Sequence, residues 1–177
     1  MDAAAQYRQL LELGRNEFLA AAAPAALVRY RRDEFADQIN SGLHTLTIDD
    51  DLDFGDGNPE ETRPHGKDLP QGVDLEVYPL VKKPGASFPD RITLGRTSNN
   101  DVVIPDTSVS RLHAYVRRDG NSWVVADAGS KNGSWLRGLQ LEPRREQALT
   151  SRTVLRLGDV DLTFYLAADL YAALGGA

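Results

Sequence analysis

The sequence predicts a mainly β protein whose larger part is an antiparallel β-sandwich, and three observations lead to this class. After residue 72 the chain consists of short runs of alternating or β-branched apolar residues. Turn-forming clusters separate these runs, as at Pro84-Gly85, Asn132-Gly133 and Gly158-Asp159. No helical periodicity lies between the runs, which disfavours an α/β fold. We therefore expect a sandwich over residues 72–166, with a helical segment on either side of it.

Residues 1–40 are predicted to form a helical segment of two short helices. Residues 3–23 are good helix formers, and their apolar side chains recur at the three- and four-residue spacing of an amphipathic helix. Pro24 suits the first turn of a second helix, which we expect to end near Gly42. The longest apolar stretch, residues 18–28, is too short to span a membrane, so we expect a cytoplasmic protein.

Residues 41–71 are predicted to be a flexible acidic linker. They combine clustered Asp and Glu with Gly and Pro, and they hold few large apolar side chains. Such a segment buries too little surface to offset the entropy lost on ordering. Residues 1–71 carry a net charge of -7, whereas residues 72–166 carry +2. The two parts of the chain therefore differ in charge as well as in pattern.

The strands of the sandwich are expected in eight runs that begin after Gly72. These are "VDLEVYPL", "RITLG", "DVVI", "LHAYVRR", "SWVVADA", "SWLRG", "TVLRLG" and "VDLTFYLA". Residues 167–177 then show helical spacing and end on glycines, which predicts a short C-terminal helix docked on the sandwich. A chain of 177 residues, 41% of them hydrophobic, is long enough for one such domain with appendages.

Composition argues against several classes of site. The chain has no cysteine, so it can hold neither a disulfide nor a thiolate metal site. Its three histidines, His44, His65 and His113, are scattered without the spacing of a zinc site, and we expect no metal or cofactor. The basic pairs share no common stripe and the net charge is -6, so we do not expect nucleic acid as a partner.

The stretch from residue 94 to 116 contains the side chains most suited to chemistry. As an enzyme, the protein would use Ser110 as a nucleophile and His113 as its base. Two residues three apart at the start of a strand point to opposite faces, however, and no Gly-x-Ser-x-Gly elbow supports the serine. We therefore predict no catalytic residue. Arg96, Ser110 and Arg111 instead supply the planar donor fork, hydroxyl and backbone amides that an anion requires.

Four motifs in a fixed order connect this stretch with a second one downstream. They are Gly95-Arg96, Asn100–Ile104, Ser110–Ala114 and Asp127–Ser134. In this order and spacing they resemble the forkhead-associated (FHA) domain, a phosphothreonine-reading antiparallel β-sandwich of the FHA/SMAD-like kind. The resemblance covers roughly residues 72–166, about half of the chain.

The resemblance implies a role for each matching residue. Arg96 and Ser110 are expected to hold the phosphate oxygens, and Arg111 to flank the phosphate or the bound peptide. Asn132 is expected to hydrogen-bond the peptide backbone next to the phosphothreonine. Lys131 stands where the family commonly has threonine. It is therefore expected either to place an additional cation near the ligand or to change what the neighbouring loop accepts.

Four further residues are implied to be structural at the site. Gly95 and His113 are expected to support the binding loops, with His113 as a buried tie between them. Gly133 suits a tight turn with positive φ and leaves the preceding amide side chain available. Ser134 replaces the threonine common in the family and is expected to brace the loop.

The family and the Ala- and Arg-rich composition imply a non-catalytic signalling or scaffold module of a bacterial Ser/Thr kinase pathway. Its partners would be a phosphothreonine-containing protein or peptide and a Ser/Thr protein kinase, without nucleic acid or membrane. Thr45, Thr47 and Thr62 lie in acidic surroundings and are candidate phosphoacceptors through which the module could bind its own linker. A phospho-independent interaction protein that uses the same loops or the N-terminal helices is the alternative.

Overall fold

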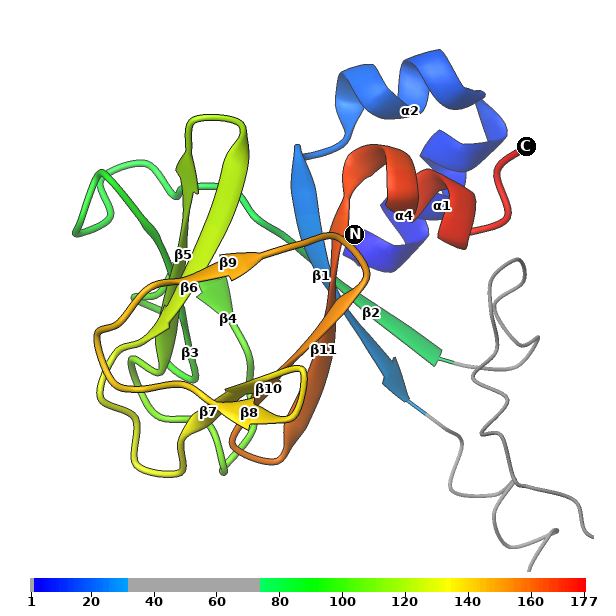
Figure 1. The fold of residues 1–177 in the computed structure, drawn as a ribbon. Helices are drawn as coiled ribbons and strands as arrows, with labels where there is room; N and C mark the ends of the chain where they lie inside the picture. The colour runs from blue at the N-terminus through cyan, green and yellow to red at the C-terminus, as the bar shows by residue number, and fades with distance from the viewer. Residues whose placement is uncertain (1, 32–73) are drawn as a thin grey trace, which may run out of the picture.

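Two β-sheets packed face to face form the body of the protein. The computed structural model describes residues 2–31 and 74–177. One sheet has the strand order β2-β1-β11-β10-β7-β8, and the other has the order β4-β3-β5-β6-β9 (Figure 1). All pairings between these strands are antiparallel except β3 with β4. The predicted class, a mainly β sandwich with helical segments before and after it, is confirmed.

The strands are short, as is usual where turns are frequent. Their bounds are β1 Ala25–Arg31, β2 Asp74–Pro79, β3 Ile92–Gly95, β4 Val102–Val103, β5 Ala114–Asp119, β6 Ser122–Asp127, β7 Ser134–Leu136, β8 Leu139–Gln140, β9 Gln147–Leu149, β10 Thr153–Leu157 and β11 Val160–Leu166.

The main hydrophobic core lies between the two sheets and follows from residue alternation. In β10, Leu155 and Leu157 are fully buried, whereas the intervening Arg156 is exposed. Successive side chains of a strand point to opposite faces, so this pattern buries one face and leaves the other in solvent. Trp123 and Phe164 meet edge to face across the core at 5.8 Å between ring centroids.

The predicted second helix is wrong for residues 25–31, which form strand β1 between β2 and β11. Leu27 faces the main core, while Ala26 and Val28 pack into a second core on the opposite side of the sheet. A strand buried on both faces has a continuous apolar run instead of alternation, and such a run also fits a helix. The sandwich thus includes a strand that precedes residue 72.

In the described parts of the chain, three helices pack on the outer side of β1, β2 and β11 in the six-stranded sheet (Figure 1). They are α1 (Ala3–Glu12), α2 (Arg15–Ala21) and α4 (Ala167–Ala173). Phe18 is fully buried among them, with its ring 5.7 Å from Tyr7 and 5.2 Å from Tyr171. This aromatic cluster packs on Val28 and Tyr165 of the sheet, which joins the two ends of the chain in one core.

The predicted N-terminal helix of residues 3–23 is divided in two. Gly14 has φ +97°, a conformation that breaks a right-handed helix, and α2 starts at the next residue. Ala23 has its backbone amide bonded to the hydroxyl of Tyr7 at 3.2 Å, which fixes the turn between α2 and β1. The C-terminal helix lies where it is predicted.

The predicted linker, residues 41–71, lies outside the described residues. The same holds for the candidate phosphoacceptors Thr45, Thr47 and Thr62. Across residues 2–31 and 74–177, no helix combines the length and apolar character needed to cross a membrane.

Candidate functional site

Three loops meet at one end of the sandwich and bring the predicted binding residues together. The backbone amide of Arg96 donates to the carbonyl of Ser110 at 3.0 Å, which joins the loop after β3 to the loop before β5. The backbone amide of Lys131 donates to Ser110 Oγ at 3.0 Å, and Asn132 Nδ2 donates to the Ser108 carbonyl at 2.8 Å. The loop between β6 and β7 is thereby fastened to the same place.

Arg96 is exposed, and its guanidinium is oriented by a single bond. Its Nε donates to the Val109 carbonyl at 3.0 Å. The two terminal amino groups have no hydrogen-bond partner among the described residues. These are the groups that form the two parallel bonds of an arginine to a phosphate or carboxylate. The geometry therefore holds the side chain and leaves its donor fork available.

Ser110 lies between this arginine and the loop that follows β6. Its Oγ accepts the bond from the Lys131 amide, so the hydroxyl hydrogen is still available to donate. Ser110 is partly exposed, and the neighbouring Arg111 and Lys131 are exposed. The hydroxyl can thus contribute a short donor to an anion beside the guanidinium.

The three cations at this end, Arg96, Arg111 and Lys131, have no ion-pair partner within residues 2–31 and 74–177. In the described parts of the chain, each of them lies more than 4.0 Å from any carboxylate oxygen. The ten ion pairs that do form there involve other basic residues. An anion that enters this site therefore meets positive charge that no carboxylate of the described residues offsets.

His113 is fully buried behind the loops and links two of them. Its Nδ1 accepts from the backbone amide of Ser110 at 2.9 Å, and its Nε2 lies 2.8 Å from the Gly133 carbonyl. Because a backbone amide can only donate, Nδ1 must be the unprotonated nitrogen and Nε2 the donor. The ring is therefore neutral and turned away from solvent, in a position suited to support and not to proton transfer.

The neutral ring of His113 predicts that stability falls in mild acid. Burial lowers the pKa of His113 below its ordinary 6.5, despite the opposing bond to Gly133. As the pH falls, the unfolded chain therefore takes up a proton on this histidine before the folded chain does. The stability that depends on neutral His113 is complete above pH 6.5 and is lost as the pH falls below that value. Urea unfolding measured from pH 7.5 to 5 should show a slope approaching about 1.4 kcal/mol per pH unit in this window.

The control for this titration is the His113→Gln variant, whose unfolding free energy should lack this part of the slope. Carboxylates with lowered pKa, such as Asp101, titrate in the unfolded chain near 3.8 and contribute mainly below the window. A wild-type curve that stays flat between pH 7.5 and 5 would contradict the neutral, buried state of His113.

The loop after β6 is organised by Asp127, a residue to which the sequence prediction gave no role of its own. Its Oδ2 accepts from the Gly129 and Ser130 amides, and its Oδ1 accepts from the hydroxyls of Ser130 and Ser134. Burial alone would raise the pKa of Asp127, but these bonds outweigh it and hold the pKa below its ordinary value. The signal available in the sequence is an Asp followed by Gly and Ser, typical of a side-chain-capped turn.

Two glycines allow the loops to approach closely. Gly133 has φ +83° and directs its carbonyl to His113. A Cβ on Gly95 would lie 2.1 Å from the Arg111 carbonyl oxygen and 2.6 Å from Asn100 Nδ2. Asn100 is itself buried and donates to the same Arg111 carbonyl. Because residue 95 has no side chain, β3 can approach the loop before β5 this closely.

Comparison with known proteins agrees with this architecture. The family model described as FHA domain matches residues 92–158. The chain is 30% identical to an oxoglutarate dehydrogenase inhibitor of Corynebacterium jeikeium over 61% of its own length and 76% of that protein. It is 36% identical to the inhibitor of the same name from Corynebacterium diphtheriae, over 54% and 66% of the two chains.

A solved structure also matches, the N-terminal FHA domain of S. cerevisiae Rad53p in complex with a phosphothreonine peptide. It is 21% identical, with a TM-score of 0.41 over 46% of this chain and 71% of that one. The family model and the Corynebacterium jeikeium relative together show that this chain belongs to the family of FHA domain proteins.

Proposed function

We propose that this chain binds phosphothreonine-containing peptides through the loops around Arg96 and acts as a non-catalytic signalling or scaffold module. The observation that carries the proposal is the convergence of Arg96, Ser110, Arg111 and Lys131 without a neutralising carboxylate among the described residues. In this reading Arg96 and Ser110 hold the phosphate, Arg111 and Lys131 flank it, and Asn132 bonds the peptide backbone.

The chemistry of the ligand fits these groups. A phosphothreonine carries a charge of about -1.5 to -2 at pH 7 and three strong acceptor oxygens. Hydrogen bonds to charged groups contribute roughly 1.5 to 3 kcal/mol each, and immobilising the peptide offsets part of that gain. We therefore expect affinities for short peptides in the micromolar range, about 8 kcal/mol.

The bound partner, in this proposal, is a protein that a bacterial Ser/Thr kinase has phosphorylated in the cytoplasm. Relatives named as inhibitors of a dehydrogenase support a regulatory role in which binding itself, without catalysis, alters the partner. A second ligand is the chain itself after phosphorylation at Thr45, Thr47 or Thr62. Asp50 stands three residues after Thr47, a position that FHA domains often read.

The test is a binding screen of the full-length protein against a degenerate library of phosphothreonine peptides. The same library without phosphate and with phosphoserine serves as control. We expect binding to require phosphothreonine and to depend on the residues that follow the phosphothreonine in the peptide. Equal binding of phosphorylated and plain peptides would instead support a phospho-independent interaction protein.

A further inference from the structure

A pocket of about 360 Å³ opens on the outer face of the five-stranded sheet, next to the phosphate site. Its floor comes from β3 and β5, whose Thr93 and Tyr115 are paired across the sheet. The helices α1, α2 and α4 pack on β1, β2 and β11 of the other sheet. The residues that line the pocket are Phe88, Arg91, Thr93, Leu112, Tyr115, Ala128 and Arg144.

The pocket has an apolar rim that remains in contact with solvent. Phe88 is 49% exposed and Leu112 is 40% exposed. Large exposed apolar side chains that gather at one pocket mark a surface for binding. Leu112 directly follows Arg111 of the phosphate site, and consecutive Cα atoms are about 3.8 Å apart. A single extended peptide can therefore contact both places.

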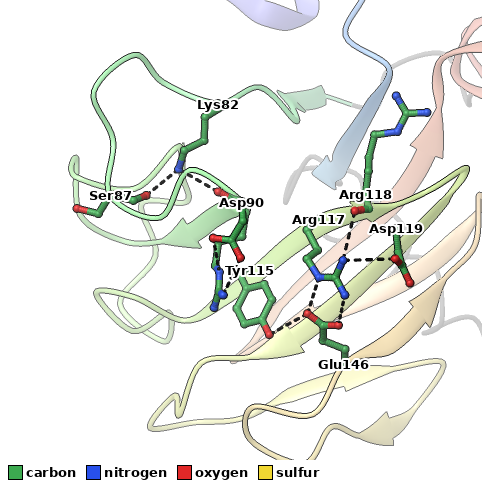
Figure 2. Close-up of polar contacts among 9 residues, drawn as sticks. Lys82, Ser87, Asp90, Tyr115, Arg117, Arg118, Asp119 and Glu146 are labelled. Atoms are coloured by element: carbon green, nitrogen blue, oxygen red, sulfur yellow. Dashed lines mark hydrogen bonds and ion pairs between the residues drawn. The ribbon is translucent and has the colours of Figure 1, made fainter.

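The loop that carries Phe88 is held in a strained conformation. Phe88 has φ +61°, which is rare for a bulky side chain. Lys82 fastens the loop, because its Nζ donates to the carbonyls of Ser87 and Arg91 at 2.8 and 2.9 Å (Figure 2). It also donates to the buried carboxylate of Asp101 at 2.8 Å. Strain that the surroundings maintain in this way is concentrated at functional surfaces.

The floor of the pocket is fixed by a polar network on β5. Tyr115 donates to Glu146 at 3.2 Å, and Arg117 binds the same carboxylate with two bonds of 2.7 and 2.6 Å (Figure 2). These bonds hold the Tyr115 hydroxyl at Glu146, and the tyrosine ring forms part of the pocket floor. The guanidinium of Arg91 lies 4.4 Å from the centre of that ring.

Among the residues that the structure describes, the lining carries two arginines and no carboxylate, so its charge is positive. Arg91 is paired with Asp90 at 2.9 Å, outside the lining. Arg144 is exposed and has no carboxylate within 4.0 Å in the described part of the chain. It too has a positive φ, +64°, and its amide is bonded to the Asp127 carbonyl at 2.7 Å. The complementary occupant is an apolar side chain with an acidic neighbour.

We infer that this pocket is a second docking site for the phosphorylated partner. It receives a leucine or phenylalanine side chain, flanked by an acidic residue, from the same segment that carries the phosphothreonine. The aliphatic or aromatic group packs between Phe88, Leu112 and Tyr115, and the carboxylate pairs with Arg144. This inference rests on the proposed phosphothreonine binding and assigns part of its selectivity to a surface beside the phosphate.

The experiment uses the full-length protein and synthetic phosphothreonine peptides with Gly/Ser flanks. An Asp-Leu or Asp-Phe pair is placed in turn at each position up to eight residues from the phosphothreonine, on either side. Binding is measured by fluorescence anisotropy. We expect the pair to improve affinity about five- to tenfold at placements on one side only, as partial burial of one such side chain predicts.

Two variants separate the pocket from the phosphate site. Phe88→Gly removes the rim, and glycine adopts φ +61° readily, so the fold is retained. It should abolish the gain from the apolar pair and leave the affinity of the plain phosphopeptide unchanged.

The Arg144→Asn variant tests the charge of the pocket. Asparagine tolerates the left-handed conformation, and the variant should reduce the contribution of the aspartate to affinity. Its matched control is Arg137→Asn, another exposed arginine with positive φ, +52°, outside this pocket.

The outcomes distinguish this inference from the proposal on which it rests. If the wild type binds plain and apolar-paired phosphopeptides equally, the pocket is not a docking site, although phosphothreonine binding stands. A gain that survives in Phe88→Gly leads to the same conclusion. If no phosphopeptide binds at all, both proposals fail. A dimer that sediments in the wild type and dissociates in Phe88→Gly would assign the pocket to a second copy of the chain and overturn the inference.

Discussion

Replacement of Arg96 by alanine is expected to weaken the binding of a phosphothreonine peptide at least about 100-fold, because two charge-assisted bonds are lost together. In the unbound protein this side chain makes one side-chain hydrogen bond among the described residues, from Nε to Val109. Its removal should therefore change the free energy of unfolding by no more than about 1 kcal/mol. Isothermal titration calorimetry and urea unfolding measure the two quantities separately.

The control for this variant is Arg118→Ala, which removes an exposed arginine of β5 that is not part of the phosphate site. It changes the net charge by the same amount, so any general electrostatic effect is matched. Arg96→Lys retains the charge without the planar fork and should lie between the wild type and the alanine variant. Unaltered affinity of Arg96→Ala would contradict the assignment of the phosphate site.

Replacement of Gly95 by alanine is expected to reduce the free energy of unfolding by at least about 3 kcal/mol, the upper range for overpacking. The new methyl group would lie 2.1 Å from the Arg111 carbonyl oxygen, and backbone cannot move as a flexible side chain does. Asn100 and Thr97 also donate to this carbonyl, so displacement of one strand disturbs the whole site. Phosphopeptide binding should therefore weaken together with stability.

Gly120→Ala provides the matched control for this prediction. Gly120 has φ +62° in the turn between β5 and β6, but a Cβ there would meet nothing within 4 Å. Gly120→Ala should lower the free energy of unfolding by only about 1 kcal/mol, the penalty for placing alanine in this conformation. Its affinity for the phosphopeptide should be unchanged. Similar unfolding curves for the two variants would show that the close approach at Gly95 is not a constraint.

The sandwich could be predicted because most of its strands can be recognised from the local pattern of apolar and polar residues. β10 alternates buried and exposed residues, and turn-forming pairs such as Asn132-Gly133 mark the ends of strands. β1 could not be recognised in this way. Both of its faces are covered, one by the main core and one by the helices, so the alternation that identifies a strand is absent.

The order of the motifs led to the proposed binding residues, while the contacts that position them could not be predicted. Sequence gives no indication that Arg96 Nε reaches Val109, or that the two nitrogens of His113 join separate loops. The pocket lined by Phe88 and Arg144 could not be predicted for a related reason. Both residues have a left-handed backbone conformation, which a sequence indicates only where glycine, asparagine or aspartate stands.

The position of β1 between β2 and β11 determines how the chain would respond to a protease. Arg31 and Asp74 are opposite each other in the antiparallel pair of β1 and β2, so the stretch between them starts and ends at neighbouring points. A single cut within residues 32–73 would divide the polypeptide into two pieces. The smaller piece would still be held between β2 and β11 and by the core around Phe18. Cleavage would break the covalent chain, but the two pieces would stay bound to each other.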